Sequence, residues 1–180
     1  MSVKHIALIG FMGAGKTTCG KILAEKLGLD FIDTDDYVEK SEGMSVAELF
    51  ERHSERYFRD LEAAALRDAL AHVEPHVIAC GGGIVTLPAN VAALQKRALI
   101  VSLTMEPEQA LARFGDFASR PLLATAKSSD EIFSLMKARD ILYKATADFS
   151  ISTDRRSAVS VVEAIIDHLE ETAHACVHED

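Results

Sequence analysis

The chain has 180 residues, enough for one domain with a single hydrophobic core. Its formal net charge of −9 argues against a nucleic-acid-binding protein, because binding to a phosphate backbone usually needs an excess of Lys and Arg. Three widely spaced cysteines indicate reduced thiols, and no apolar run suits a signal peptide or a membrane span. We therefore expect a cytoplasmic protein that binds neither nucleic acid nor a membrane.

Strand-like and helix-like segments alternate along the chain, which predicts an α/β fold with a parallel sheet covered by helices on both faces. The five expected strands are 4–10, 29–36, 75–83, 97–103 and 148–153. The expected helices are 16–28, 45–70 in one or two pieces, 105–113, 130–147 and 158–173. Ligands of such sheets bind beyond the carboxyl ends of the strands.

The first strand leads into GFMGAGKT, a Gly-x-x-x-x-Gly-Lys-Thr motif that opens a helix. Glycines let successive N–H groups point at phosphate oxygens, and the helix adds its positive end. Lys16 supplies a charge for the β- and γ-phosphates, and the Thr17 hydroxyl can ligate Mg²⁺. The motif predicts a nucleoside triphosphate site made of Gly13, Ala14, Gly15, Lys16, Thr17 and Thr18.

Two acids, Asp33 and Asp35, stand at the end of the second strand. On an extended segment, residues at i and i+2 point the same way. One carboxylate could help to hold Mg²⁺, and the other could accept the proton of a substrate hydroxyl. Taken alone, a solvated acidic turn is the simpler interpretation.

Three further motifs suggest a site for the acceptor and a lid. In FRDLE, Glu62 could hold Arg59 toward a substrate carboxylate, although the two could also form an exposed i, i+3 pair. The run Gly81–Gly83 has more glycines than a turn needs, which favours close approach of the backbone to a ligand. In SRPLL, Arg120 suits a lid that reaches the transferring phosphate, or it is an ordinary surface residue.

The remaining sequence narrows the class of protein. The only asparagine is Asn90, so the chain has no Asn-Lys-x-Asp element with which to read guanine. The chain is also short for a motor or transport ATPase. A small-molecule phosphotransferase is the leading hypothesis.

Together these motifs resemble the shikimate kinase family, within the nucleoside-monophosphate-kinase-like group of P-loop proteins. The matching segments GFMGAGKTT, DTD, FRDLE, GGG and RPLL, followed by Arg139 and Tyr143, have the family's order and spacing. The resemblance implies a three-layer P-loop kinase fold in one domain, 1–180. That domain would contain a shikimate-binding helical region at about 34–62 and a lid at about 113–126.

The resemblance also implies roles for individual residues. Lys16, Asp35 and Arg120 would be catalytic, and Mg²⁺ would bind at Thr17 and Asp33. Shikimate would be bound by Asp35, Arg59, Gly81, Gly82, Gly83 and Arg139. Arg113 and Arg155 would flank the adenine of ATP, and Arg120 would contact its phosphates.

The reaction implied is ATP-dependent phosphorylation of the 3-hydroxyl of shikimate by a monomer, with ATP and shikimate as its partners. Two departures from the family pattern are Ser54, where glycine is usual, and Ala79, where Ser or Thr is common. A kinase for another polyol acid such as gluconate is the first alternative. A non-catalytic ATP-binding regulator is the second.

Overall fold

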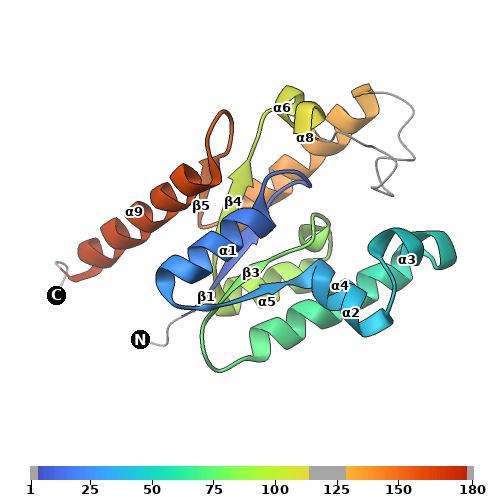
Figure 1. Cartoon of the computed structure of the whole chain (residues 1–180), viewed down its shortest axis with the longest axis horizontal. Coiled ribbons are helices and arrows are strands. Elements are labelled where there is room, and N and C mark those ends of the chain that lie inside the picture. Colours follow the sequence, from blue (N-terminus) through green and yellow to red (C-terminus); the bar gives the residue numbers. More distant parts are fainter. Residues whose placement is uncertain (1–3, 114–128, 178–180) are drawn as a thin grey trace.

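The computed structural model describes residues 4–113 and 129–177 and confirms the predicted α/β architecture (Figure 1). Five parallel strands form one sheet in the order β2-β3-β1-β4-β5. The strands are β1 (His5–Ile9), β2 (Asp30–Asp33), β3 (His76–Ala79), β4 (Ala98–Thr104) and β5 (Phe149–Ser152). The helices are α1 (Lys16–Leu27), α2 (Thr34–Glu42), α3 (Val46–Arg52), α4 (Glu55–Ala71), the short 3₁₀ helix η1 (Ile84–Thr86), α5 (Pro88–Arg97), α6 (Pro107–Arg113), α8 (Ser129–Thr146) and α9 (Ala158–Val177).

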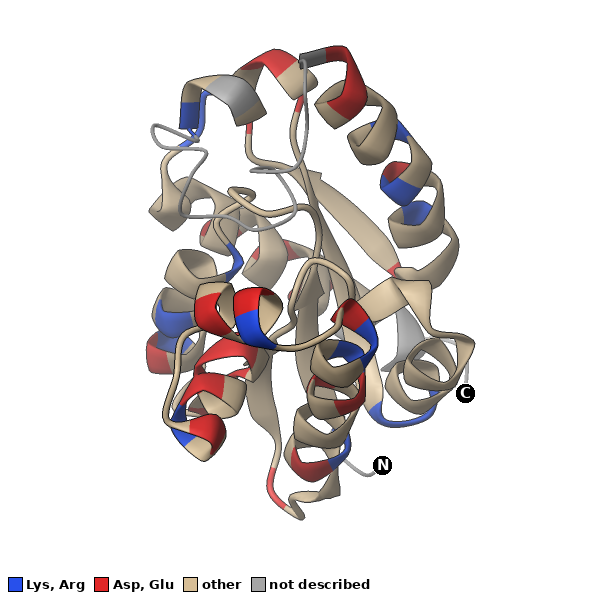
Figure 2. Cartoon of the chain, turned by 90° about the vertical axis from the view of Figure 1, so that its right-hand side faces the viewer, with Lys and Arg blue, Asp and Glu red and all other residues tan. Residues whose placement is uncertain are grey.

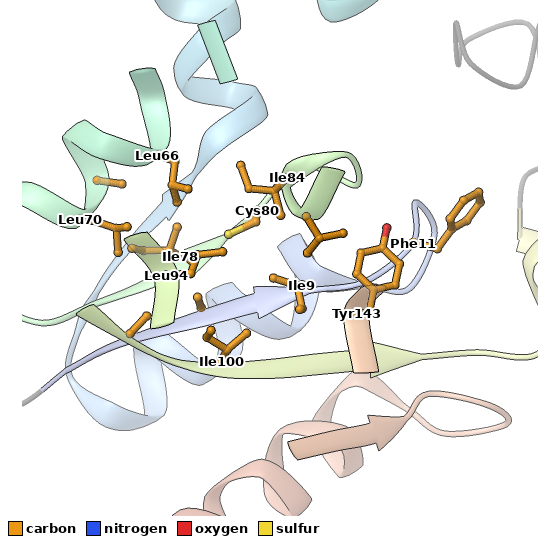
Figure 3. Close-up of a cluster of buried hydrophobic side chains, with 14 of the residues drawn as sticks. Ile9, Phe11, Leu66, Leu70, Ile78, Cys80, Ile84, Leu94, Ile100 and Tyr143 are labelled. Atoms are coloured by element: carbon orange, nitrogen blue, oxygen red, sulfur yellow. The ribbon is translucent and has the colours of Figure 1, made fainter. Parts of the chain in front are cut away.

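Side chains along each strand alternate between the two faces of the sheet, and helices cover both faces. In β1, Ile6 and Leu8 pack with α1 and α9, whereas Ala7 and Ile9 pack with α4, α5 and α8. Figure 3 shows this second layer, where Ile9 lies among side chains from both the sheet and its covering helices. The central strands β1, β3 and β4 are therefore mostly apolar and buried, whereas β2 and β5 at the two edges of the sheet are partly exposed.

Helices α2 and α3 lie beside the sheet and pack on α4, which also covers one face of the sheet (Figure 1). A small apolar cluster of Val38, Leu49, Phe58 and Ala65 joins them. The predicted helical stretch 45–70 is two helices, because Ser54 caps the start of α4 by accepting the N–H of Tyr57 at 3.3 Å. The residue that departs from the family pattern here thus serves as a helix cap.

The strand and helix pattern predicted neither α2 nor α5, although the family resemblance implied a helical region at about 34–62. Helix α5 occupies 88–97, between the third and fourth strands, and Arg97 belongs to it rather than to β4. Its signals were a proline at the first helical position and basic residues in its last turn. The apolar residues of this short segment form a less clear pattern than those of the strand that follows it, so the helix was not recognised.

Charged residues lie mainly on the helices, and the strands carry few of them (Figure 2). In the described part of the chain, no helix combines the length and the apolar character that spanning a bilayer requires. The acidic residues that give the chain its negative net charge are therefore spread over the helices. The site described below differs from this surface because it gathers several cations.

A histidine cluster lies at the amino ends of the strands, opposite the carboxyl ends. His5 is buried, its ring centroid is 5.9 Å from that of His76, and its Nδ1 accepts the N–H of His76 at 3.1 Å. His76 contacts His72 at 4.5 Å between centroids, and its Nε2 is 3.9 Å from Asp30. Burial, and then the neighbouring charges of His76 and His72, lower the pKa of His5.

This cluster predicts that stability falls in mild acid. Below pH 6.5 the unfolded chain binds a proton that folded His5 resists, so the free energy of unfolding decreases as the pH decreases. His5→Asn keeps an acceptor for the His76 N–H but does not titrate. Urea unfolding between pH 5 and 8 should show a shallower acid slope for this variant, and an unchanged slope would contradict the assignment to His5.

Candidate active site

The glycine loop lies where the sequence motif predicts, between the end of β1 and the start of α1. Gly15 caps α1 in a left-handed conformation, and Lys16 is the first helical residue. The Lys16 Nζ donates to the backbone oxygens of Gly10 at 2.9 Å and Phe11 at 3.1 Å, so the ammonium group lies across the loop. Thr17 and Thr18 are exposed in the first helical turn. The loop therefore combines the start of a helix with a cation, the combination that binds phosphate groups in proteins.

Asp33 is linked to this loop. Its Oδ2 accepts a hydrogen bond from the Thr17 hydroxyl at 2.7 Å, and its Oδ1 caps α2 by accepting the N–H groups of Asp35 at 3.0 Å and Asp36 at 3.4 Å. The expectation that Asp33 and Asp35 share an extended segment is wrong, because helix α2 begins at Thr34. The helix turn gives the two carboxylates different directions: Asp33 faces Thr17, and Asp35 faces the next pocket.

A pocket of about 230 Å³ adjoins the glycine loop. One side is apolar, where the rings of Phe50 and Phe58 lie 4.8 Å apart between centroids. The other side is charged and carries both carboxylates and guanidinium groups. The lining residues are Met12, Asp35, Glu39, Ser45, Val46, Ala47, Phe50, Phe58, Arg59, Glu62, Gly82, Gly83 and Arg139.

Arg59 and Glu62 form a buried ion pair rather than an exposed one. The Arg59 Nη1 lies 2.8 Å from Glu62 Oε2, and the side chains are 10% and 1% exposed. Glu55 adds a second contact, 3.0 Å from Arg59 Nη2. Burial opposes the charge on Arg59, but the charge and hydrogen bonds of Glu62 and Glu55 outweigh it and leave the pKa of Arg59 raised. The guanidinium is therefore held in place and charged.

Asp35 lies next to this pair. Burial, followed by the charges of Glu62 and Asp33, raises its pKa to about 7, although Lys16 and Arg59 act in the opposite direction. Burial also raises the pKa of Glu62. Among the described residues, nothing hydrogen-bonds Asp35 Oδ1 or Glu62 Oε1, although both atoms are buried. Two buried carboxylate oxygens thus have unused capacity to accept hydrogen bonds, which is uncommon in a folded protein.

Two of the three glycines after β3, Gly82 and Gly83, line the pocket. A Cβ on Gly83 would overlap the Nη1 and Cζ atoms of Arg59, and one on Gly81 would overlap Glu62 Oε1 and lie 2.6 Å from Asp35 Oδ1. At Gly82 the nearest atom would be at an ordinary 3.5 Å. The groups that come close to Gly81 and Gly83 are the site's own charged side chains, and the close approach of a ligand stays a prediction.

Arg139 enters the pocket from α8. Its Nη1 donates to the backbone oxygen of Gly82 at 3.2 Å, and its Cζ lies 5.8 Å from the ring centroid of Phe11. Tyr143, one turn later, donates to the same oxygen at 2.5 Å and is visible beside Phe11 in Figure 3. Burial raises the pKa of Tyr143 to about 12, so it stays a donor. No role was predicted for Tyr143 from the sequence.

Arg113 lies on the other side of the glycine loop. Its guanidinium donates to the backbone oxygens of Gly13 at 3.3 Å and Thr153 at 2.6 Å. Arg155 follows in the same loop, is exposed, and has a left-handed backbone with φ 53°. The predicted lid, apart from Arg113, lies outside the described residues, and so does Arg120.

A five-stranded parallel sheet, a phosphate-type glycine loop and an adjoining pocket with paired acids and arginines define a P-loop phosphotransferase of small molecules. The sequence model described as "Shikimate kinase" matches residues 12–170. The chain belongs to the shikimate kinase family.

Individual relatives agree with this assignment. The chain is 44% identical to a shikimate kinase of Caldanaerobacter subterraneus subsp. tengcongensis over 164 residues, which are 91% of this chain and 95% of that protein. A solved shikimate kinase of Acinetobacter baumannii, in complex with shikimate, aligns with a TM-score of 0.90 and 33% identity, over 95% of both chains. One from Aquifex aeolicus aligns with a TM-score of 0.83 and 35% identity, over 94% of this chain and 98% of that one.

Proposed function

We propose that the protein transfers the γ-phosphoryl group of ATP to the 3-hydroxyl of shikimate, giving shikimate 3-phosphate and ADP. The observation that carries this proposal is the pocket beside the glycine loop, which has guanidinium groups and unpartnered carboxylate oxygens. Shikimate has a carboxylate at one end and three hydroxyls at the other. Arg59 and Arg139 would bind its carboxylate, and Asp35 would accept hydrogen bonds from its hydroxyls.

Asp35 is the proposed base. A pKa of about 7 lets this carboxylate take up the hydroxyl proton during transfer and release it at neutral pH. Lys16 and Arg120 would stabilise charge on the transferring phosphoryl group. Gly81, Gly82 and Gly83 would close on the ring of shikimate, with Phe50 and Phe58 as its apolar wall.

The Thr17 hydroxyl and the Asp33 carboxylate fit a divalent cation, because they are hard oxygen donors 2.7 Å apart at the end of the phosphate loop. Bound Mg²⁺ would neutralise charge on the ATP phosphates. Arg113 and Arg155 would flank the adenine, since Arg113 already joins the glycine loop to the loop after β5. We further propose that the enzyme is monomeric and works in the cytoplasm.

The test of the proposal is the structure of the product. The protein, Mg²⁺, ATP and shikimate should give a compound whose phosphorus couples to the C3 proton in ³¹P–¹H NMR spectra. Phosphate on another hydroxyl would contradict the placement of Asp35, and no phosphorylated product would contradict the function.

Gly83→Ala is expected to raise the KM for shikimate about 10- to 100-fold, because the new methyl group displaces the Arg59 guanidinium. Steady-state kinetics with either substrate varied measures this effect. Gly82→Ala is the comparison variant from the same loop, since its methyl group would overlap no atom and would lie at ordinary contact distances, 3.5 Å from Met12 N and 3.8 Å from Arg139 Nη1. Equal effects of the two substitutions would show that the overlap with Arg59 is not the cause.

A further inference from the structure

Thr34 extends the pairing of β2 and β3 by one hydrogen bond. The last backbone pair of these strands joins Asp33 and Ala79, after which the chain of β2 turns into α2. Beyond this point the N–H of Gly81 donates to the Thr34 hydroxyl at 2.8 Å. On the other side of β3, the N–H of Cys80 donates to the backbone oxygen of Leu8 at 3.0 Å. A side-chain oxygen thus accepts a backbone hydrogen bond just beyond the last backbone pair of β2 and β3.

The Thr34 hydroxyl has no obvious substitute. Thr34 is 0% exposed and Gly81 is buried too, so bulk water does not reach the Gly81 N–H. A buried N–H that loses its acceptor keeps the full cost of desolvation, which favours movement of the backbone toward another partner. The position of Gly81 therefore depends on this oxygen.

Small movements of Gly81 matter because of its neighbours. Its Cα lies against the Asp35 and Glu62 carboxylates, so closely that a Cβ would be 2.6 Å from Asp35 Oδ1 and would overlap Glu62 Oε1. A shift of the loop in one direction presses on the proposed base, and a shift in the other opens a gap beside it. On the far side, Arg139 and Tyr143 hold the Gly82 oxygen from α8.

We propose that Thr34 is a positioning residue of the acceptor pocket: its hydroxyl holds the Gly81–Gly83 loop at the distance from Asp35 that phosphoryl transfer to shikimate requires. This inference rests on the proposed function. Thr34 itself does not touch the substrate, because it lies behind the loop and does not line the pocket.

The test compares Thr34→Val, which has the same shape without an acceptor, with Thr34→Ser, which keeps the hydroxyl. Thr34→Val should lower kcat/KM for shikimate about 10- to 100-fold, while the KM for ATP stays within about twofold. Thr34→Ser should restore most of the activity. Thr146→Val is the matched control, since it removes another buried hydroxyl, one that donates at 2.8 Å to Leu142 within α8.

The outcomes are distinct. A lower unfolding temperature with unchanged kinetics for Thr34→Val would overturn the proposal, and so would equal losses for the Val and Ser variants. Thr34→Ala serves if the Val variant does not fold.

Hydrogen exchange of the Gly81 amide, followed by NMR, should be faster without the hydroxyl, and this readout does not depend on the substrate. If wild type fails to phosphorylate shikimate, the proposed function is lost, whereas unchanged Gly81 exchange would overturn the role of Thr34.

Discussion

Replacing Asp35 by asparagine is expected to lower kcat for shikimate phosphorylation about 10²- to 10⁴-fold, the usual contribution of a positioned base. The amide has nearly the same shape but cannot accept the hydroxyl proton. Because the ATP loop is formed by other residues, the Kd for ATP should stay within about twofold. ADP release and ATP titration calorimetry measure the two quantities. Undiminished turnover would exclude Asp35 as the base.

The same carboxyl predicts a pH dependence of the wild-type enzyme. With the pKa of Asp35 raised to about 7, the base becomes protonated as the pH falls through neutrality, so kcat/KM for shikimate should decrease below that point. Glu62 is buried beside Asp35, so the inflection belongs to the two carboxyls together. A flat profile between pH 5.5 and 8 would contradict this account.

Stability provides the control for Asp35→Asn. An acid whose pKa is higher in the folded state binds a proton more tightly there, so ionising Asp35 destabilises the fold as the pH rises from about 4 to 7. The variant should therefore unfold at the same or a higher temperature than wild type at pH 8. A large loss of stability would show that a change in kcat reflects misfolding.

Arg59→Lys is expected to raise the KM for shikimate about 10- to 100-fold, equivalent to the roughly 1.5–3 kcal/mol of a hydrogen bond to a charged group. Lysine keeps the charge that Glu62 requires, but it loses the planar fork that binds a carboxylate through two hydrogen bonds. Alanine would be a poorer choice, because it leaves Glu62 buried without its cation. The KM for ATP should stay within about twofold.

Arg56→Lys is the matched control, on an exposed position of the same helix. Its kinetic constants should equal those of wild type. If Arg59→Lys raised the two KM values equally, the carboxylate of shikimate would have to bind elsewhere, and Arg139 would be the first candidate.

The sheet, the glycine loop and the class of protein could be predicted from the sequence because they depend on local patterns. An apolar run that ends in Gly-x-x-x-x-Gly-Lys-Thr specifies a strand, a loop and a helix in turn. The geometry of Asp35 could not be predicted in this way. Whether a carboxylate after a strand is extended or helical depends on where the next helix begins, and here Asp33 caps α2 at once.

The burial of the Arg59–Glu62 pair could not be predicted either. The i, i+3 spacing is the same for an exposed pair, and only the packing of α4 against Gly83 decides between them. Tyr143 and Thr34 were missed as positioning groups for a similar reason. Each acts on the backbone of a loop distant in sequence, 61 and 47 residues away, and no local pattern reports such a contact.

The most direct test of the account is the rate of ADP release from Mg·ATP with shikimate, quinate, gluconate and a panel of nucleoside monophosphates as acceptors. The account predicts saturable turnover with shikimate and little with the others, because in the proposed function Arg59 and Arg139 bind a carboxylate and Asp35 needs a correctly placed hydroxyl. Preferred turnover of gluconate or a nucleoside monophosphate, or binding of ATP without turnover of any acceptor, would contradict it.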